Sequence, residues 1–136
     1  MILVDAGPLA AALNPQDTWH VWASKQLNIL QPPLYTCDAV LSEAFFLLRK
    51  VIGGRKRLIE VFENEVFVSS FDSNAQSKHL HELLRAYFDV PMSFADSCLV
   101  RMSELSPGSK VLTCDRDFLI YRKHGRQTIP LIAPWK

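Results

Sequence analysis

The hydrophobic positions of the chain alternate between short apolar runs and longer stretches with helical spacing. Short apolar runs predict buried strands, whereas apolar residues three and four positions apart predict amphipathic helices. The pattern predicts five strands, over residues 1–4, 34–37, 66–70, 110–114 and 129–133. It predicts helices over residues 18–30, 39–52, 57–64, 74–88 and 93–105.

This alternation of strands and helices predicts the fold class. Strands that are apolar throughout are typical of a parallel sheet buried on both faces, and helical connections between them cover both faces. We therefore expect an α/β fold, a three-layer α/β/α sandwich with a central parallel β-sheet of about five strands. No repeat, low-complexity tract or linker divides the chain, so residues 1–136 are expected to form a single domain.

The composition limits which partners the protein can bind and indicates the cellular compartment in which it folds. The 136 residues are 49% hydrophobic and 21% charged, which is typical of a globular protein, and no apolar segment is long enough to predict a membrane span. The net charge of +1 provides no overall attraction for nucleic acid or an anionic membrane, so such a partner needs a local patch. Three cysteines without paired spacing, Cys37, Cys98 and Cys114, predict reduced thiols in a cytoplasmic protein.

Acidic residues at a few positions distinguish this sequence from a generic α/β domain. Asp5 follows the first predicted strand, and Asp115 and Asp117 follow the fourth, at the carboxyl ends where parallel sheets bind ligands. Glu43 and Asp96 lie in predicted helices with apolar residues three and four positions away. The sequence therefore predicts that both of these carboxylates face the packed side of a helix.

Each acid also has a purely structural interpretation. Asp5 is suited to capping the following turn, Ser93 and Asp96 have the spacing of a capping box, and Asp115 or Asp117 is suited to beginning a turn. The acids point to chemistry only if they converge at one edge of the sheet.

Converging carboxylates would repel one another, so they would be partly protonated or would bind a cation. Ligands that are all oxygen select a hard ion such as Mg²⁺ or Mn²⁺. The chemistry that such a site supports is hydrolysis of a phosphodiester bond, with no side-chain nucleophile required. Thr113 is interpreted either as a residue that positions a water or a phosphate oxygen, or as an ordinary β-branched strand residue.

Four motifs in order, MILVDAGPL, LSEAFFLL, FADSCLVRMSE and LTCDRDF, give the chain its resemblance to a known family. From Met1 to about Ile132, the chain resembles PIN-domain ribonucleases, the toxins of VapBC-type toxin–antitoxin pairs. Many members have Ser or Thr after the first Asp, whereas this chain has Ala6 and Gly7.

The resemblance implies a catalytic acidic cluster that binds Mg²⁺ or Mn²⁺ and hydrolyses RNA. Its catalytic members would be Asp5, Glu43, Asp96 and Asp115, with Asp117 as a further metal ligand. The sequence leaves open whether Asp115 or Asp117 is the fourth ligand, although strand alternation favours Asp115. The resemblance also implies a homodimer and an antitoxin protein as a partner.

Nine of the fifteen basic residues fall into two clusters that bear on RNA binding. The first, between Arg49 and Arg57, is interpreted mainly as solvated turns and a cationic helix terminus. The second follows the last acidic motif and predicts contact with the RNA backbone through Arg116, Arg122 and Lys123.

The leading hypothesis is thus a Mg²⁺- or Mn²⁺-dependent endoribonuclease of the PIN class, which serves as a toxin. The alternative is a catalytically degenerate PIN-like module that binds RNA or protein, which is favoured if the acids do not converge or no metal binds. A phosphoryl-transfer enzyme is disfavoured because the segment Asp5-Ala6-Gly7 lacks the second Asp of an Asp-x-Asp pair.

Overall fold

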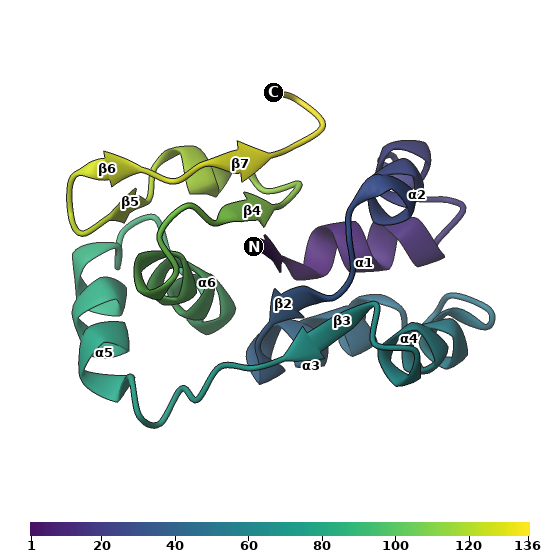
Figure 1. The fold of residues 1–136 in the computed structure, drawn as a ribbon, viewed down its shortest axis with the longest axis horizontal. Helices are drawn as coiled ribbons and strands as arrows, with labels where there is room; N and C mark the ends of the chain where they lie inside the picture. Colours follow the sequence, from purple (N-terminus) through teal and green to yellow (C-terminus); the bar gives the residue numbers. More distant parts are fainter.

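A five-stranded parallel sheet forms the centre of the computed structural model, which describes residues 1–136 (Figure 1). The strand order is β3-β2-β1-β4-β7, and each neighbouring pair is parallel. The strands are β1 (Ile2–Val4), β2 (Leu34–Thr36), β3 (Phe67–Ser69), β4 (Lys110–Leu112) and β7 (Leu131–Ile132). The predicted parallel sheet of about five strands is confirmed.

Six helices cover this sheet and complete the three layers. They are α1 (Ala6–Leu13), α2 (His20–Ile29), α3 (Asp38–Leu47), α4 (Gly54–Glu63), α5 (Ser77–Ala86) and α6 (Phe94–Leu105). Figure 1 shows α5 and α6 on one side of the strands and α1, α2 and α4 on the other, while α3 packs against both α1 and α6. The predicted α/β/α sandwich is therefore confirmed. None of the helices combines the length and the apolar character that a membrane span requires.

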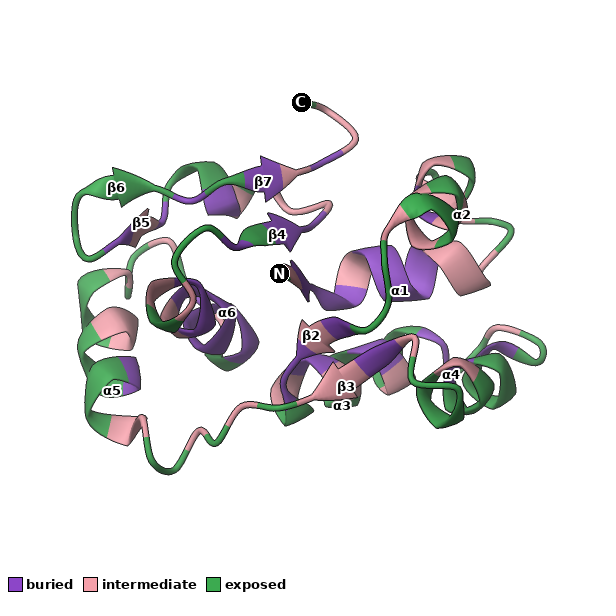
Figure 2. Cartoon of the chain, viewed as in Figure 1, coloured by how far each residue is buried: buried purple, intermediate pink, exposed green.

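The core lies where the helices cover the central strands. Leu3 and Val4 of β1 and Val111 and Leu112 of β4 have no exposed surface, as the predicted burial on both faces requires. Figure 2 shows this buried material in β4, in α1 and along α6. Because β1 pairs directly with β4, the N–H of Asp5 donates to the carbonyl of Leu112 at 3.0 Å. The residues that follow these two strands are therefore neighbours.

Several elements differ from the sequence prediction. The helix α1 was not predicted, because it is apolar at nearly every position and shows no helical stripe. The 3₁₀ helix η1 (Arg116–Leu119) and the hairpin of β5 (Arg122–Lys123) and β6 (Gln127–Thr128) were not predicted either, because they are only two to four residues long. The helix predicted over residues 39–52 ends at Leu47. Turns then lead to Gly53, whose φ of +70° places it in the left-handed region that favours glycine, and α4 begins at the next residue.

Candidate active site

An acidic pocket of about 400 Å³ lies at the carboxyl edge of the sheet. Its lining includes five carboxylates, supplied by the ends of β1 and β4, by α3, by α6 and by η1. They are the five that the sequence analysis singled out: Asp5, Glu43, Asp96, Asp115 and Asp117. No basic side chain lines the pocket. The structure thus brings together acids from four separate segments of the chain.

Asp5 lies between the ends of β1 and β4 and is only 6% exposed. Its Oδ1 accepts a hydrogen bond from the N–H of Ala6 at 2.7 Å, so Asp5 also caps α1. Its Oδ2 accepts a hydrogen bond from the hydroxyl of Thr113 at 2.7 Å. Asp5 therefore caps α1, as the structural interpretation predicted, and it also lines the pocket. One carboxylate oxygen forms the cap, and the other accepts from Thr113.

Thr113 is a positioning residue for this carboxylate. Its side chain has no exposed surface, and its Oγ1 also accepts the N–H of Asp115 at 2.9 Å. The hydroxyl therefore joins the ends of the two central strands. The interpretation that Thr113 meets a water or a phosphate is corrected, because its hydroxyl is buried and bonded to protein atoms on both sides.

Asp96 has separate roles for its main chain and its side chain. Its N–H donates to Oγ of Ser93 at 3.0 Å, which caps α6 as the spacing predicted. Its carboxylate is 6% exposed and accepts a hydrogen bond from the hydroxyl of Tyr121 at 2.8 Å. The predicted burial of Asp96 is confirmed, and the helix cap leaves its carboxylate available to the pocket.

Tyr121 is a residue of the site that the sequence pattern did not predict. Tyr121 is fully buried and packs edge-to-face against Tyr87 and Phe118. A buried tyrosine hydroxyl requires a hydrogen-bond partner, and this is the one signal that the sequence offered. The partner, Asp96, lies 25 residues away, so local spacing did not identify it.

Glu43 lies in the pocket but not in the setting that was predicted. The expectation that it projects from a packed stripe is wrong, because Glu43 is exposed, as are Phe46 at 60% and Leu47 at 48%. Instead, α3 packs against the core with a different face, the one that carries Val40 and Ala44. Glu43 therefore stands at the rim of the pocket.

Asp115 and Asp117 lie together at the start of η1. Oδ1 of Asp115 accepts the N–H of Asp117 at 2.8 Å, so Asp115 caps this short helix, and both side chains are partly exposed. Since both residues line the pocket, the question of which one is the fourth ligand stays open.

The carboxyl groups of the pocket have no cationic partner in the chain, and each of the four with a shifted pKa holds its proton more tightly than a free acid does. Burial, and secondly the charge of Asp96, raise the pKa of Asp5 to about 7. Burial, together with the charge of Asp115, raises the pKa of Asp96 to about 6. Burial and the charge of Asp115 likewise raise the pKa of Glu43 and of Asp117. The only ion pair in the structure joins Arg101 to Glu104, outside the pocket.

Metal coordination stays a prediction. No group of three or more His, Cys, Asp or Glu side chains is arranged so that it could hold a metal ion. Cys114 also lines the pocket, but burial raises the pKa of its thiol to about 12. The thiol is therefore neutral at physiological pH and does not act as an anionic ligand.

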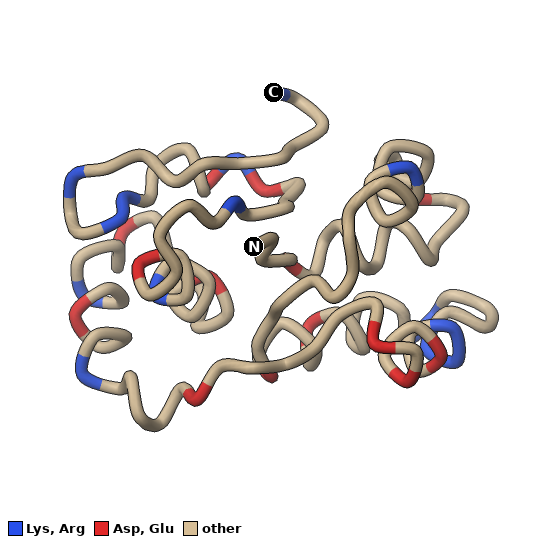
Figure 3. The backbone as a smooth tube through the Cα atoms, viewed as in Figure 1, with Lys and Arg blue, Asp and Glu red and all other residues tan.

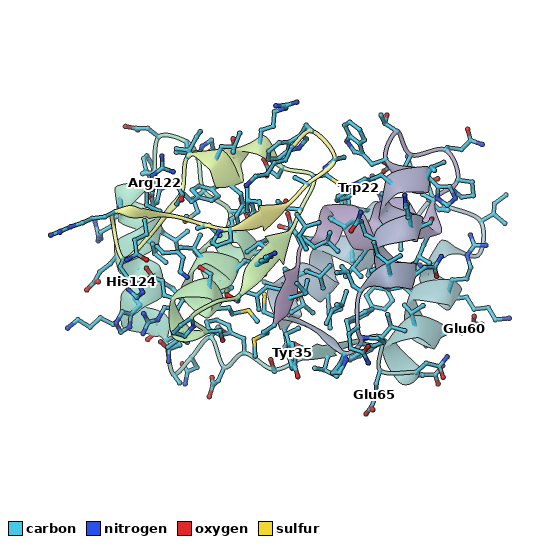
Figure 4. All side chains as sticks on the ribbon, turned by 45° about the horizontal axis from the view of Figure 1, so that its top comes forward. Trp22, Tyr35, Glu60, Glu65, Arg122 and His124 are labelled. Carbon is cyan, nitrogen blue, oxygen red and sulfur yellow. The ribbon has the colours of Figure 1, made fainter.

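The second basic cluster is placed differently from the prediction. Arg116 is exposed next to Asp115, with its guanidinium 4.9 Å from the ring centroid of Trp135. Arg122 instead donates to backbone carbonyls of Leu119, Ile120 and Tyr121. It lines a separate pocket of about 560 Å³, and Figure 4 shows it with His124 at one end of the molecule.

Lys123 is only 7% exposed. The structure therefore brings neither Arg122 nor Lys123 to the acidic pocket, because the unpredicted β5–β6 hairpin carries them away from β4. Of the three predicted RNA-contacting cations, only Arg116 lies beside the acids.

The fold and the pocket define a class, an α/β/α sandwich with acidic side chains gathered where its central parallel strands end. A scan against protein-family models finds no model that matches the chain, and a search of curated proteins finds no match.

Proposed function

We propose that this protein is a Mg²⁺- or Mn²⁺-dependent endoribonuclease of the PIN class, which serves as the toxin of a toxin–antitoxin pair. The observation that carries the proposal is the convergence of five carboxylates on a pocket without a basic residue. The resemblance of the four acidic motifs to PIN domains supports the same function. The proposal includes an antitoxin protein and a second copy of the chain as partners.

The chemistry of the pocket fits a hard divalent cation. All of the acidic donors are oxygen atoms, and the carboxylates of Asp5 and Asp96 are buried without a cationic partner. When bound, the metal ion would activate a water, hold the scissile phosphate and stabilise the leaving oxygen. Asp5, Glu43, Asp96 and Asp115 would hold it, with Asp117 as the alternative to Asp115.

The residues of the chain prepare this site in two ways. Thr113 and Tyr121 orient the buried carboxylates of Asp5 and Asp96 through their hydroxyl groups. Glu43 is exposed at the rim, and no hydrogen bond contributes to the shift of its pKa. Its side chain is therefore free to move toward the buried pair. Binding requires such a movement, since no three acids are grouped for coordination in the structure.

One observation favours a second candidate, the catalytically degenerate PIN-like module that binds RNA or protein. The pocket acids do not form a group that is ready to hold a metal ion. In that case the carboxylates would serve only to recognise a positively charged partner or to shape the pocket.

Cleavage of a mixed structured RNA distinguishes the two functions. The purified protein, freed of any co-purified partner, is incubated with Mg²⁺, Mn²⁺ or EDTA, beside Asp96→Asn and the control Glu63→Gln, which changes an exposed residue of α4. We expect metal-dependent cleavage by the wild type and Glu63→Gln, and a loss of at least about 100-fold in Asp96→Asn, since removing a group that acts in the transition state costs this much. Equal cleavage by Asp96→Asn would overturn the mechanism. No cleavage by the folded wild type would favour the binding module.

A further inference from the structure

A second groove, of about 680 Å³, adjoins the acidic pocket. The exposed side chain of Leu47 lines both the groove and the pocket, so the two lie side by side. The rest of the groove is formed by residues 14–16 after α1, residues 49–52 after α3, and Arg57 of α4. We define these residues as the basic groove, because Arg49, Lys50 and Arg57 line it and no acidic residue does.

The three cations of the basic groove are not neutralised by the protein. None of them takes part in an ion pair. Figure 3 shows basic residues gathered at the start of α4, and no acidic residue lines the groove beside them. The groove therefore keeps its positive charge for a ligand.

Two of these cations are held in place. The guanidinium of Arg49 lies 3.8 Å from the ring centroid of Phe46 and donates to the carbonyl of the same residue at 2.9 Å. Arg57 donates to the carbonyls of Leu13 and Ile52 at 3.2 and 3.4 Å. Anchoring reduces the side-chain entropy that would be lost when a ligand binds.

Apolar surface lies between the cations. Leu47 is 48% exposed, and Ile52 is 96% exposed. Single-stranded RNA presents phosphates and base faces, and proteins bind it with cationic groups for the phosphates and with aromatic rings or arginine planes for the bases. The guanidinium plane of Arg49 is itself a surface on which a base can stack.

We infer that the basic groove binds the single-stranded RNA segment that flanks the scissile phosphate, an inference that rests on the proposed function. The acidic pocket repels phosphates, so a polyanion that enters it needs a cationic anchor nearby. The groove and the pocket share Leu47 in their lining, which favours one ligand that lies across both, whereas an acidic peptide would match only the groove. The cluster that the sequence assigned mainly to solvated turns is thus a better RNA site than Arg122 and Lys123.

Binding and cleavage are measured separately to test this inference. Binding uses a fluorescent 2′-O-methyl RNA of about ten nucleotides, within the range of known single-strand sites, in EDTA so that no cleavage occurs. The variants are Lys50→Gln and the double variant Arg49→Gln/Lys50→Gln, which change exposed residues after α3. The matched control is Lys78→Gln, which changes an exposed lysine on α5.

We expect the double variant to bind about tenfold more weakly, with the slope of log affinity against log salt reduced by about 1.4, or 0.7 per lost phosphate contact. With cleavable RNA, its KM should rise while kcat is kept, because the acidic pocket is unchanged. Lys78→Gln should match the wild type in both measurements.

The outcomes separate the groove from the catalytic proposal. Suppose that the wild type cleaves RNA and that the double variant has the same affinity, salt slope and KM as Lys78→Gln. The groove inference is then overturned, while the nuclease proposal stands. If the double variant weakens binding but no protein cleaves, the groove stands and the nuclease falls. If neither the wild type nor Lys78→Gln binds the RNA, the groove belongs to a different ligand such as an acidic peptide, and the inference is overturned.

Discussion

The carboxylate of Asp5 accepts two hydrogen bonds and has no cationic partner, although it is almost completely buried. Burying an unpaired charge costs free energy, and a carboxyl group avoids part of this cost by taking up a proton. Burial and the neighbouring Asp96 accordingly raise its pKa from 3.8 to about 7. In the absence of metal, the folded protein therefore binds protons more tightly than the unfolded chain does.

This linkage predicts that the metal-free protein loses stability as pH rises. Between about pH 4 and pH 7 the folded state holds a proton on Asp5 that the unfolded state has released, so the free energy of unfolding falls with pH. A pKa difference of this size corresponds to about 4 kcal/mol at most. Urea denaturation in EDTA at a series of pH values measures the effect.

Asp5→Asn provides the comparison, because asparagine keeps an acceptor for the N–H of Ala6 and carries no charge. We expect its unfolding free energy to exceed that of the wild type near pH 8 and to vary less between pH 4 and pH 7. Asp89→Asn, which changes an exposed acid, should follow the wild type. A wild-type free energy that rises over this range would contradict the account.

The side-chain environments were only partly predictable from local spacing. Asp96 was expected on the packed side of its helix and is buried there. Glu43 had the same apolar spacing and is exposed, because two stripes of α3 are apolar and only the one with Val40 and Ala44 faces the core. Spacing shows which residues share a face, but the packing of neighbouring elements decides which face is buried.

At the scale of elements, the start of α6 links folding to the site. Ser93 accepts the N–H of Asp96, and the same turn presents the Asp96 carboxylate to Tyr121. The cap therefore positions the acid as well as stabilising the helix.

We expect Ser93→Ala to lower the free energy of unfolding by about 1 kcal/mol, the usual cost of losing an N-cap. Chemical denaturation at neutral pH measures this change. Ser93→Thr, which keeps a hydroxyl acceptor, should recover most of it. Equal losses in both variants would show that packing around Ser93, and not the cap, supports the helix.

The elements that were predicted are those with a strong apolar pattern of sufficient length. All five sheet strands and five of the six helices match predicted segments, with shifts of a few residues at their ends. The missed elements lack such a pattern. In α1, apolar residues occupy nearly every position, and β5 and β6 have two residues each and depend on pairing with each other.

At the scale of the whole molecule, the strand order creates the pocket. Because β1 lies beside β4, residues that are 108 positions apart, Asp5 and Thr113, share a hydrogen bond. The helices α3 and α6 pack against each other and bring Glu43 and Asp96 to the same edge. The acids thus converge through contacts between distant segments.

This convergence predicts that Mn²⁺ stabilises the folded protein. A ligand that binds only the native state adds about 2.7 kcal/mol at a concentration 100 times its Kd, which raises Tm by several degrees for a domain of this size. Thermal unfolding at neutral pH should show this rise for the wild type and for Glu63→Gln, whose change lies outside the pocket.

Asp5→Asn should show a much smaller rise in Tm with Mn²⁺, since one of the two buried carboxylates no longer carries charge. An equal rise in Asp5→Asn would place the metal elsewhere on the chain. The absence of any rise in the wild type would favour the binding module over the nuclease.

The amino-acid sequence by itself determined the α/β alternation, the parallel sheet and the five acidic positions, because hydrophobic periodicity and the residues after apolar strands are local properties. Only the tertiary structure decided which helix faces are buried, that Thr113 and Tyr121 orient Asp5 and Asp96, and that the basic groove around Lys50 adjoins the acids while Lys123 lies apart. The physical reason is that these relations join residues distant in the chain, and strand order and helix packing, not local spacing, set their proximity.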